Sequence, residues 1–240
     1  MRFAIVSLNN NKIRKIAQTL GAYCHNIDIC NPEFVVTYGG DGTILYAERK
    51  YPEIPKITIR GSSGGYKCLY SESDLENILL KIDNGKYSLR EEPKLETVFE
   101  GRRCLSLNNV QIYNQNPAST IRFSIFVNDK PLYLNVIGDG VVVASPFGST
   151  TYYASVSGFK SGFSGDWIGI ALNNPHKYGC DEDTIDRSSL VDINSNIDIK
   201  ILRNDGLLLL FDSDNSIINT KEGDMISIGV SKITAKFVIV

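Results

Sequence analysis

The pattern of apolar residues changes near residue 86, and this change restricts the folds open to the chain more than any other feature. Before it, strand-like apolar runs alternate with helical patterns. Such alternation predicts a parallel sheet with helices on its faces, a small doubly wound Rossmann-like domain. After it, short strands separated by turns predict a mostly β, sandwich-like domain. We therefore expect an α/β plus β fold, with domains at 1–88 and 89–240.

Local signals place the individual elements. Apolar residues recur with helical spacing from Ile13 to Leu20, and Gly21 is expected to end this helix. The segment 73–76 matches a capping box that opens another helix, with Leu75, Ile78, Leu79 and Ile82 on one face. The predicted strands are 3–7, 34–37, 56–60, 94–100, 102–107, 109–113, 121–127, 131–137, 167–172, 197–202, 207–211, 225–229 and 233–240.

A glycine cluster, Gly-Gly-Asp-Gly-Thr at 39–43, lies between the strand at 34–37 and a short helical pattern at 44–49. Glycine has no Cβ, so backbone N–H groups here can approach phosphate oxygens, and the helix N-terminus adds partial positive charge. Asp41 is the one carboxylate in this cluster. It could accept a proton from an attacking hydroxyl or hold magnesium. A plain turn between strand and helix is the alternative interpretation.

A second cluster, Gly-Asp-Gly at 138–140, precedes an apolar strand at 141–144 and a Ser-Pro-Phe-Gly turn at 145–148. Ser149 is expected to cap a helix that starts near Thr150. Hydroxyl groups on the first turn of that helix can bond a ribose or the edge of a base. An ordinary Pro-Gly loop with a serine cap is the alternative.

The two clusters resemble the motifs of the NAD kinase family. Gly-Gly-Asp-Gly-Thr is similar to a motif shared by NAD kinases, diacylglycerol and sphingosine kinases and, with Ser for Thr, phosphofructokinases. The second cluster, continued to Tyr153, is similar to the NAD kinase signature and is not part of the lipid kinase pattern. Asn108 and Asn109 fall where the family carries Asn-Glu, so Asn109 replaces the acid. The run 209–212 resembles a late family strand that ends in Asp-Gly, with Ser213 in place of the glycine.

This resemblance implies transfer of a phosphoryl group from ATP or polyphosphate to the 2′-hydroxyl of the adenosine ribose of NAD, with magnesium as the divalent cation. It implies Asp41 as the group that accepts or orients the hydroxyl proton. The implied donor-side residues are Gly39, Gly40, Gly42 and Thr43. The implied NAD-side residues are Asn108 and Asn109 for the ribose, Thr150 and Tyr152 for the adenine, Asp139 for the nicotinamide end, and Thr151 and Ser155 as further binding residues. The substrate would lie between the two domains, and family members form homodimers or homotetramers.

Composition favours a reduced, cytoplasmic protein that binds neither nucleic acid nor a membrane. A net charge of -2 and a pI of about 5.8 provide no basic field for nucleic acid. No apolar run approaches the ~20 residues that span a bilayer, and no export signal is apparent. The five cysteines lack Cys-x-x-Cys spacing, as expected in a reducing compartment, and two histidines argue against a histidine-built zinc site.

Three other functions stay open. A hydrolase would use the Gly-Ser-Ser-Gly-Gly run at 61–65 as a nucleophile elbow, with Ser63 as nucleophile and His176 as base, but residues 66–70 delay the helix that should follow at once. A lipid kinase would need an apolar groove or an interfacial helix, and the predicted helices show no exposed aromatic and basic face. A non-catalytic nucleotide-binding regulator of the same fold stays open because Asn109 replaces the acid.

Overall fold

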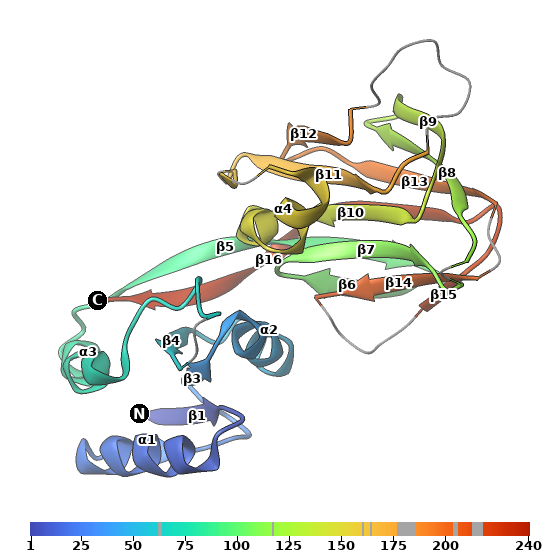
Figure 1. Ribbon diagram of the computed structural model, residues 1–240. Helices are drawn as coiled ribbons and strands as arrows, with labels where there is room; N and C mark the ends of the chain where they lie inside the picture. Colours follow the sequence, from blue (N-terminus) through green and yellow to red (C-terminus); the bar gives the residue numbers. More distant parts are fainter. Residues whose placement is uncertain are drawn as a thin grey trace. The chain divides into compact units, whose positions relative to one another are not determined.

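The computed structural model describes residues 1–61, 64–116, 118–159, 161–163, 165–176, 186–203, 206–212 and 218–240. The chain divides into two compact units, Met1–Glu92 with Thr234–Val240, and Pro93–Ile233. The predicted boundary lies after residue 88, whereas this division falls after Glu92 and assigns the last residues to the first unit. The reason is that two long strands, β5 (Ser88–Phe99) and β16 (Met225–Ile239), contribute residues to both units (Figure 1).

The first unit is a parallel sheet with helices on both faces. Its strands lie in the order β2-β1-β3-β4, and β16 pairs in parallel with β4 at Phe237. Phe3 packs in one apolar cluster with α1 and α3, and its neighbour Ala4 packs in another with α2. Successive strand residues point to opposite faces, so the helices cover both faces, and the predicted doubly wound architecture is confirmed. The elements are β1 (Arg2–Val6), α1 (Asn10–Ala22), β2 (Asn26–Ile27), β3 (Phe34–Gly39), α2 (Asp41–Lys50), β4 (Lys56–Arg60), η1 (Glu72–Asp74) and α3 (Leu75–Asp83).

Two helix boundaries in the first unit differ from the prediction. Helix α1 continues through Gly21, and Cys24 adopts the left-handed backbone conformation with φ of 58° instead. The capping box is formed by Ser71 and Asp74, because the Asp74 carboxylate accepts the Ser71 N–H at 2.7 Å. The predicted box at 73–76 is therefore wrong, although the predicted apolar face of α3 is buried.

The second unit is a sandwich of two sheets built from antiparallel pairs such as β8–β9 and β10–β11. One sheet contains β16-β13-β8-β9 with β5 and β6, and the other has the order β12-β11-β10-β7-β14-β15. Inward-facing residues of both sheets form one buried apolar cluster, which confirms the predicted sandwich. The elements are β6 (Arg102–Ser106), β7 (Asn109–Asn114), β8 (Ile121–Val127), β9 (Lys130–Gly138), β10 (Gly140–Ala144), η2 (Phe147–Thr150), α4 (Tyr152–Ser157), β11 (Trp167–Asn173), β12 (Ser188–Asp192), β13 (Ile197–Arg203), β14 (Leu207–Phe211) and β15 (Ile218–Thr220).

The sequence missed features at the edges of this sandwich. The predicted strands 225–229 and 233–240 are the single strand β16, because Gly229 continues in extended backbone without a positive φ. The short edge strands β12 and β15 were not predicted, since neither contains a long apolar run. Ser149 does not cap a helix: it is buried within η2, and α4 begins after Thr151 without a side-chain cap. Among the described helices, none is long and apolar enough to cross a membrane.

A buried ion pair anchors α2 to the sheet of the first unit. The Lys56 ammonium, which is fully buried at the start of β4, donates to the Glu48 carboxylate of α2 and to the carbonyl oxygen of Tyr51 at 2.7 Å. Removing one partner of such a pair leaves an uncompensated buried charge. The pair therefore fixes the helix whose first turn carries the glycine loop.

We expect Lys56→Met to destabilise the protein by about 3–5 kcal/mol, because the Glu48 carboxylate would stay buried without its cation. The double variant Lys56→Met, Glu48→Leu should recover most of the loss. Chemical denaturation of the purified proteins measures both effects. The exposed Lys86→Met is the control and should change stability by less than about 0.5 kcal/mol. A single variant as stable as the wild type would contradict this account.

Candidate functional site

The predicted glycine loop joins β3 to α2 in the first unit. Gly40 is the N-cap of α2 and makes no side-chain cap, so the first-turn N–H groups lack that partner. An added Cβ on Gly39 would lie 2.1 Å from Thr43 Oγ1, so only glycine allows the threonine to pack against the loop. The loop thus presents backbone donors and a hydroxyl at a helix N-terminus, the arrangement that binds anionic oxygens.

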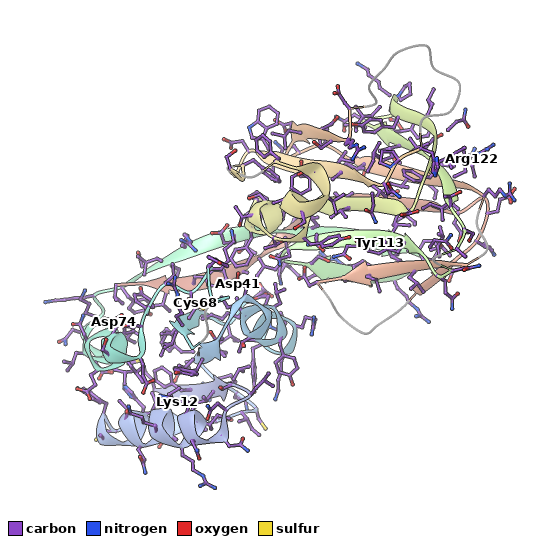
Figure 2. The ribbon with its side chains drawn as sticks, in the orientation of Figure 1. Lys12, Asp41, Cys68, Asp74, Tyr113 and Arg122 are labelled. Atoms are coloured by element: carbon purple, nitrogen blue, oxygen red, sulfur yellow. The ribbon has the colours of Figure 1, made fainter. Side chains whose placement is uncertain are left out.

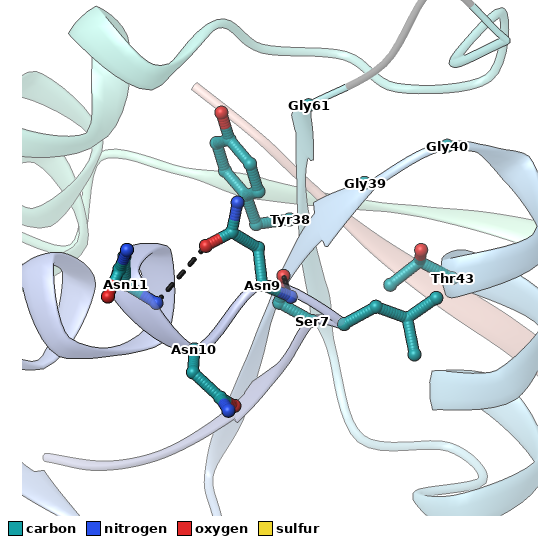
Figure 3. Close-up of a pocket in the computed structure, with 10 residues that line it drawn as sticks. Ser7, Asn9, Asn10, Asn11, Tyr38, Gly39, Gly40, Thr43 and Gly61 are labelled. Atoms are coloured by element: carbon teal, nitrogen blue, oxygen red, sulfur yellow. Dashed lines mark hydrogen bonds between the residues drawn. The ribbon is translucent and has the colours of Figure 1, made fainter.

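A cavity of about 560 Å³ opens beside this loop and is lined by residues 7–11, 38–40, Thr43 and Gly61 (Figure 3). Helix α1 also begins at this cavity, but the side chain of Asn9 caps it by accepting N–H groups of Asn11 at 3.1 Å and Lys12 at 3.2 Å. A side chain caps α1 but not α2, so the start of α2 is the better place for an anion to accept N–H groups, except for the Thr43 N–H, which donates to the Gly40 carbonyl oxygen at 3.0 Å. Gly39, Gly40 and Thr43 line the cavity, whereas Asp41 and Gly42 do not.

The carboxylate of Asp41 contacts the loop that follows β4. Asp41 Oδ1 accepts the backbone N–H of Lys67 at 2.8 Å. Two further contacts join the same loop to Gly39, whose carbonyl oxygen accepts the Gly61 N–H at 2.8 Å and lies 3.6 Å from Cys68 Sγ. Figure 2 labels Cys68 beside Asp41. Gly61, Lys67 and Cys68 of the segment after β4 therefore contact the glycine loop, and Lys67 orients Asp41.

Charges and burial at this loop set the protonation of two side chains. Burial raises the pKa of the Cys68 thiol to about 11, so the thiol is neutral and unreactive at physiological pH. Burial also lowers the pKa of Lys67, against the opposing attraction of Glu92 and Asp41. The carboxylate of Asp41 thus lies in the field of a partly desolvated cation.

In the second unit, the segment before β7 and the turn after β10 are bound together. Asn109 is paired with Ala144 across the sheet, and the Ser145 N–H donates to the carbonyl oxygen of Asn108 at 2.9 Å. The Ser145 hydroxyl donates to the carbonyl oxygen of Leu107 and accepts the Gly148 N–H at 3.2 Å. Residues 107–109 and the turn at 145–148 therefore form one hydrogen-bonded platform.

Asn108 and Asn109 are both buried on this platform, at 6% and 3% exposure. Asn109 Oδ1 accepts the Gln111 Nε2–H group at 2.5 Å. Asn108 Oδ1 has no hydrogen-bond partner within the described part of the chain. A buried polar atom without a partner is costly, so this oxygen is suited to receive a donor from a ligand.

A row of polar residues extends from Asn109 along the face of β7 that lies next to α4. Residues 109, 111 and 113 share this face because strand residues alternate, and the intervening Val110 and Ile112 are buried in the sandwich core. The ring of Tyr113 meets the half-exposed ring of Tyr152 edge to face, with 6.2 Å between centroids. The sequence analysis missed Gln111 and Tyr113, although their period-two spacing after Asn109 is the signal that identifies them.

The remaining predicted NAD-side residues are spread over this unit. Thr150 and Ser155 are exposed, and Thr151 is half-buried with its hydroxyl donating to the carbonyl oxygen of Gly148 at 2.7 Å. Asp139 precedes β10, so it lies at the opposite end of that strand from Ala144, roughly 17 Å away at 3.4 Å per residue. Its carboxylate accepts the Asn174 side-chain amide at 3.0 Å. The structure therefore does not bring Asp139 together with Asn108 and Asn109.

The residues of the rival hydrolase interpretation give it no support. Ser63 lies outside the described residues. His176 donates its backbone N–H to the carbonyl oxygen of Ile137 at 2.7 Å, so it continues the edge of the sandwich. Across the described ranges, no three histidine, cysteine, aspartate or glutamate side chains group as metal ligands.

Comparison with known proteins identifies a family. A sequence profile described as the ATP-NAD kinase C-terminal domain matches residues 107–240. The bifunctional NADP phosphatase/NAD kinase of Methanocaldococcus jannaschii is 32% identical over 138 residues, which cover 55% of this chain and 24% of that protein. The NAD kinase of Clostridium perfringens is 30% identical over 137 residues, covering 55% and 49%. The alignments thus span less than half the length of these relatives.

A solved structure extends the similarity to the whole fold. The NAD kinase from Archaeoglobus fulgidus in complex with ATP matches with a TM-score of 0.81 at 21% identity, covering 99% of this chain and 93% of that one. Residues 1–92 of the first unit, which the profile does not include, therefore share the fold of that protein as well.

We expect Gly148→Ala to disrupt the platform, because the added Cβ would lie 2.0 Å from the carbonyl oxygen of Asn108. The backbone must shift, and the cost should be about 1–3 kcal/mol of stability. Gly165→Ala is the matched control, since a Cβ there meets no atom within 4 Å. Equal stability of the two variants in chemical denaturation would show that the close approach at Gly148 is not needed.

Proposed function

The chain belongs to the NAD kinase family, and we propose that it transfers a phosphoryl group from ATP or polyphosphate to the 2′-hydroxyl of the adenosine ribose of NAD, forming NADP. The platform of the second unit is the observation that carries this proposal. It lies within the segment that the family profile matches, and it combines a buried, unpartnered Asn108 oxygen with exposed hydroxyls and a half-exposed aromatic ring on α4.

The donor phosphates are assigned to the cavity beside the glycine loop. Gly39, Gly40 and Gly42 let the backbone approach phosphate oxygens, and the uncapped N-terminus of α2 supplies N–H donors. The hydroxyl of Thr43 adds one side-chain donor at the cavity wall. ATP as donor is supported by the Archaeoglobus fulgidus structure, whose shared fold was solved with ATP bound.

Asp41 is assigned as the general base. One carboxylate oxygen is held by the Lys67 N–H, which leaves the other oxygen to accept the proton of the 2′-hydroxyl. A carboxylate whose rotamer is fixed in this way loses little entropy when the hydroxyl arrives. The oxygen of that hydroxyl then attacks the terminal phosphorus of the donor, and the bond to the leaving phosphate breaks.

Magnesium fits this site as a partner of the donor phosphates. Mg²⁺ is usually bound by one or two carboxylates together with substrate phosphates, so it does not need a cluster of three protein ligands. Asp41 provides a carboxylate at the glycine loop. When bound, the ion would screen the negative charge of the phosphates.

On the NAD side, Asn108 and Asn109 are assigned to the adenosine ribose, and Thr150 and Tyr152 to the adenine. Tyr113 supports the Tyr152 ring from the side. Thr151 and Ser155 are further binding residues on η2 and α4, and Asp139 is assigned to the nicotinamide end. An extended dinucleotide suits residues that are distributed along β10 in this way.

Two broader features belong to the same proposal. The described cysteines Cys24, Cys30, Cys68 and Cys104 are free thiols, which supports a cytoplasmic, reducing environment. A homodimer or homotetramer is proposed from family membership, and sedimentation of the purified protein measures it.

Asp41→Asn should keep the fold and bind NAD but lower the turnover number by roughly two to four powers of ten, the usual effect of losing a general base. A coupled assay of NADP formation measures the loss. The control is Asp28→Asn in the same unit, because Asp28 also accepts backbone N–H groups, from Cys30 and Asn31 at 2.9 Å, but lies away from the glycine loop. An Asp41→Asn enzyme with wild-type turnover would show that Asp41 only shapes the turn.

The acceptor atom and the metal give an independent test. NAD that lacks the 2′-hydroxyl should bind but never be phosphorylated, and excess chelator should abolish NADP formation because the charge of the donor phosphates would be unscreened. The assay is run with ATP and polyphosphate side by side. Phosphorylation of diacylglycerol instead would identify a lipid kinase. Binding of NAD with no turnover on either donor would identify a regulator of this fold.

A further inference from the structure

The carboxylate of Asp212 accepts hydrogen bonds from three successive backbone N–H groups in the second unit. The donors are Leu107 at 2.5 Å, Asn108 at 2.7 Å and Asn109 at 3.0 Å. Asp212 also donates its own N–H to the carbonyl oxygen of Asn109 at 3.2 Å. It is only 4% exposed. The Asn109 backbone is thus held by the same residue through both its donor and its acceptor.

Both the residue type and the backbone of Asp212 suit this role. Strand β14 ends at Phe211, which pairs with Val110 of β7, so the next residue lies beside the start of β7. Asp212 then adopts a left-handed conformation with φ of 49°, which aspartate and asparagine tolerate better than most residues. An ionised carboxylate has two oxygens that accept hydrogen bonds and no group that donates one. It can therefore satisfy three donors without adding a donor of its own.

Three successive N–H groups that point the same way form a concave site for an anion. Here an internal carboxylate occupies that site, so the segment 107–109 is ordered before any ligand arrives. The same segment carries the buried Asn108 Oδ1 that has no partner among the described residues. Ordering the backbone beforehand fixes where this oxygen lies and removes an entropy cost from binding.

We propose that Asp212 is a positioning residue for the acceptor substrate, fixing the backbone from which Asn108 and Asn109 bind the adenosine ribose. This inference rests on the proposed function, because the proposed function assigns the ribose to those two side chains. Asp212 acts through the backbone of residues 107–109 and does not touch the reacting atoms. Its loss should therefore weaken NAD binding far more than donor binding.

Hydrogen exchange tests the physical tether without any assumption about activity. In Asp212→Asn, an amide of equal size puts an N–H group among the donors, so the amides of residues 107–109 should exchange at least about tenfold faster. The control is Asp198→Asn on β13, which removes a carboxylate that accepts Ser227 and Asn196 side-chain donors in the other sheet. Unchanged protection at 107–109 in a folded Asp212→Asn protein would overturn the proposal.

Steady-state kinetics test the positioning role itself. We expect the KM for NAD to rise about tenfold in Asp212→Asn, with kcat and the KM for ATP within about twofold of the wild type. A merely structural role would instead lower the active fraction, and hence the apparent kcat, without changing either KM. Asp212→Glu keeps the charge but moves it by one methylene group. Its KM for NAD should therefore lie between the values of the wild type and of Asp212→Asn. Equal rises in both KM values would also overturn the proposal.

Two further outcomes separate this inference from the proposed function. If the wild type forms no NADP, the proposed function fails. The positioning role of Asp212 is then tested separately, by calorimetric titration of NAD into the wild type and the variant. Loss of NAD affinity in the variant would then still support positioning, whereas equal affinity, or no NAD binding by the wild type, would overturn it. If Asp212→Asn does not fold, Asp212→Glu is measured in the same way.

Discussion

Backbone N–H groups that lack partners in the helices and sheets are the constraint on which both candidate sites depend. A buried donor without an acceptor costs about 1–3 kcal/mol, so each such group needs a partner from the chain or from a ligand. At the start of α2 the chain supplies no side-chain cap. At 107–109 it supplies the carboxylate of Asp212. The N–H groups at the start of α2 are therefore left for a ligand, whereas the N–H groups of residues 107–109 are satisfied within the chain.

Close backbone contacts determine where these donors can be held. Gly39 allows Thr43 to pack over the loop, and Gly148 allows the turn after β10 to press against Asn108. Each contact brings together segments that a Cβ atom would separate, and each is backed by hydrogen bonds such as Gly61 N–H to the Gly39 carbonyl oxygen. Gly39 and Gly148 thus have a steric role within the chain itself, besides the approach to phosphate oxygens that the missing Cβ atoms allow at the glycine loop.

The sequence predicts the fold class, most strands and the two clusters because these depend on local pattern. The strand at 121–127 and the glycine loop are examples, since apolar alternation and glycine spacing are properties of adjacent residues. It does not predict that Lys67 would hold Asp41, or that Asp212 would hold residues 107–109. These contacts join residues about twenty-five to a hundred positions apart, so only the folded topology creates them. The edge strands β12 and β15 were missed for the opposite reason: they are too short and polar to carry a pattern.

The contacts of Asp212 and Gln111 with Asn109 bear on why this position carries a neutral residue. A glutamate there would form a stronger, charged hydrogen bond to a ribose hydroxyl. It would also add a second carboxylate next to the buried charge of Asp212, on a protein whose net charge is already -2 and whose proposed substrates are anionic. Asparagine avoids that repulsion, and the Gln111 amide fixes its oxygen at 2.5 Å. Asn109 thus forms a weaker hydrogen bond than a glutamate would, but its oxygen is oriented by Gln111 on the same face of β7.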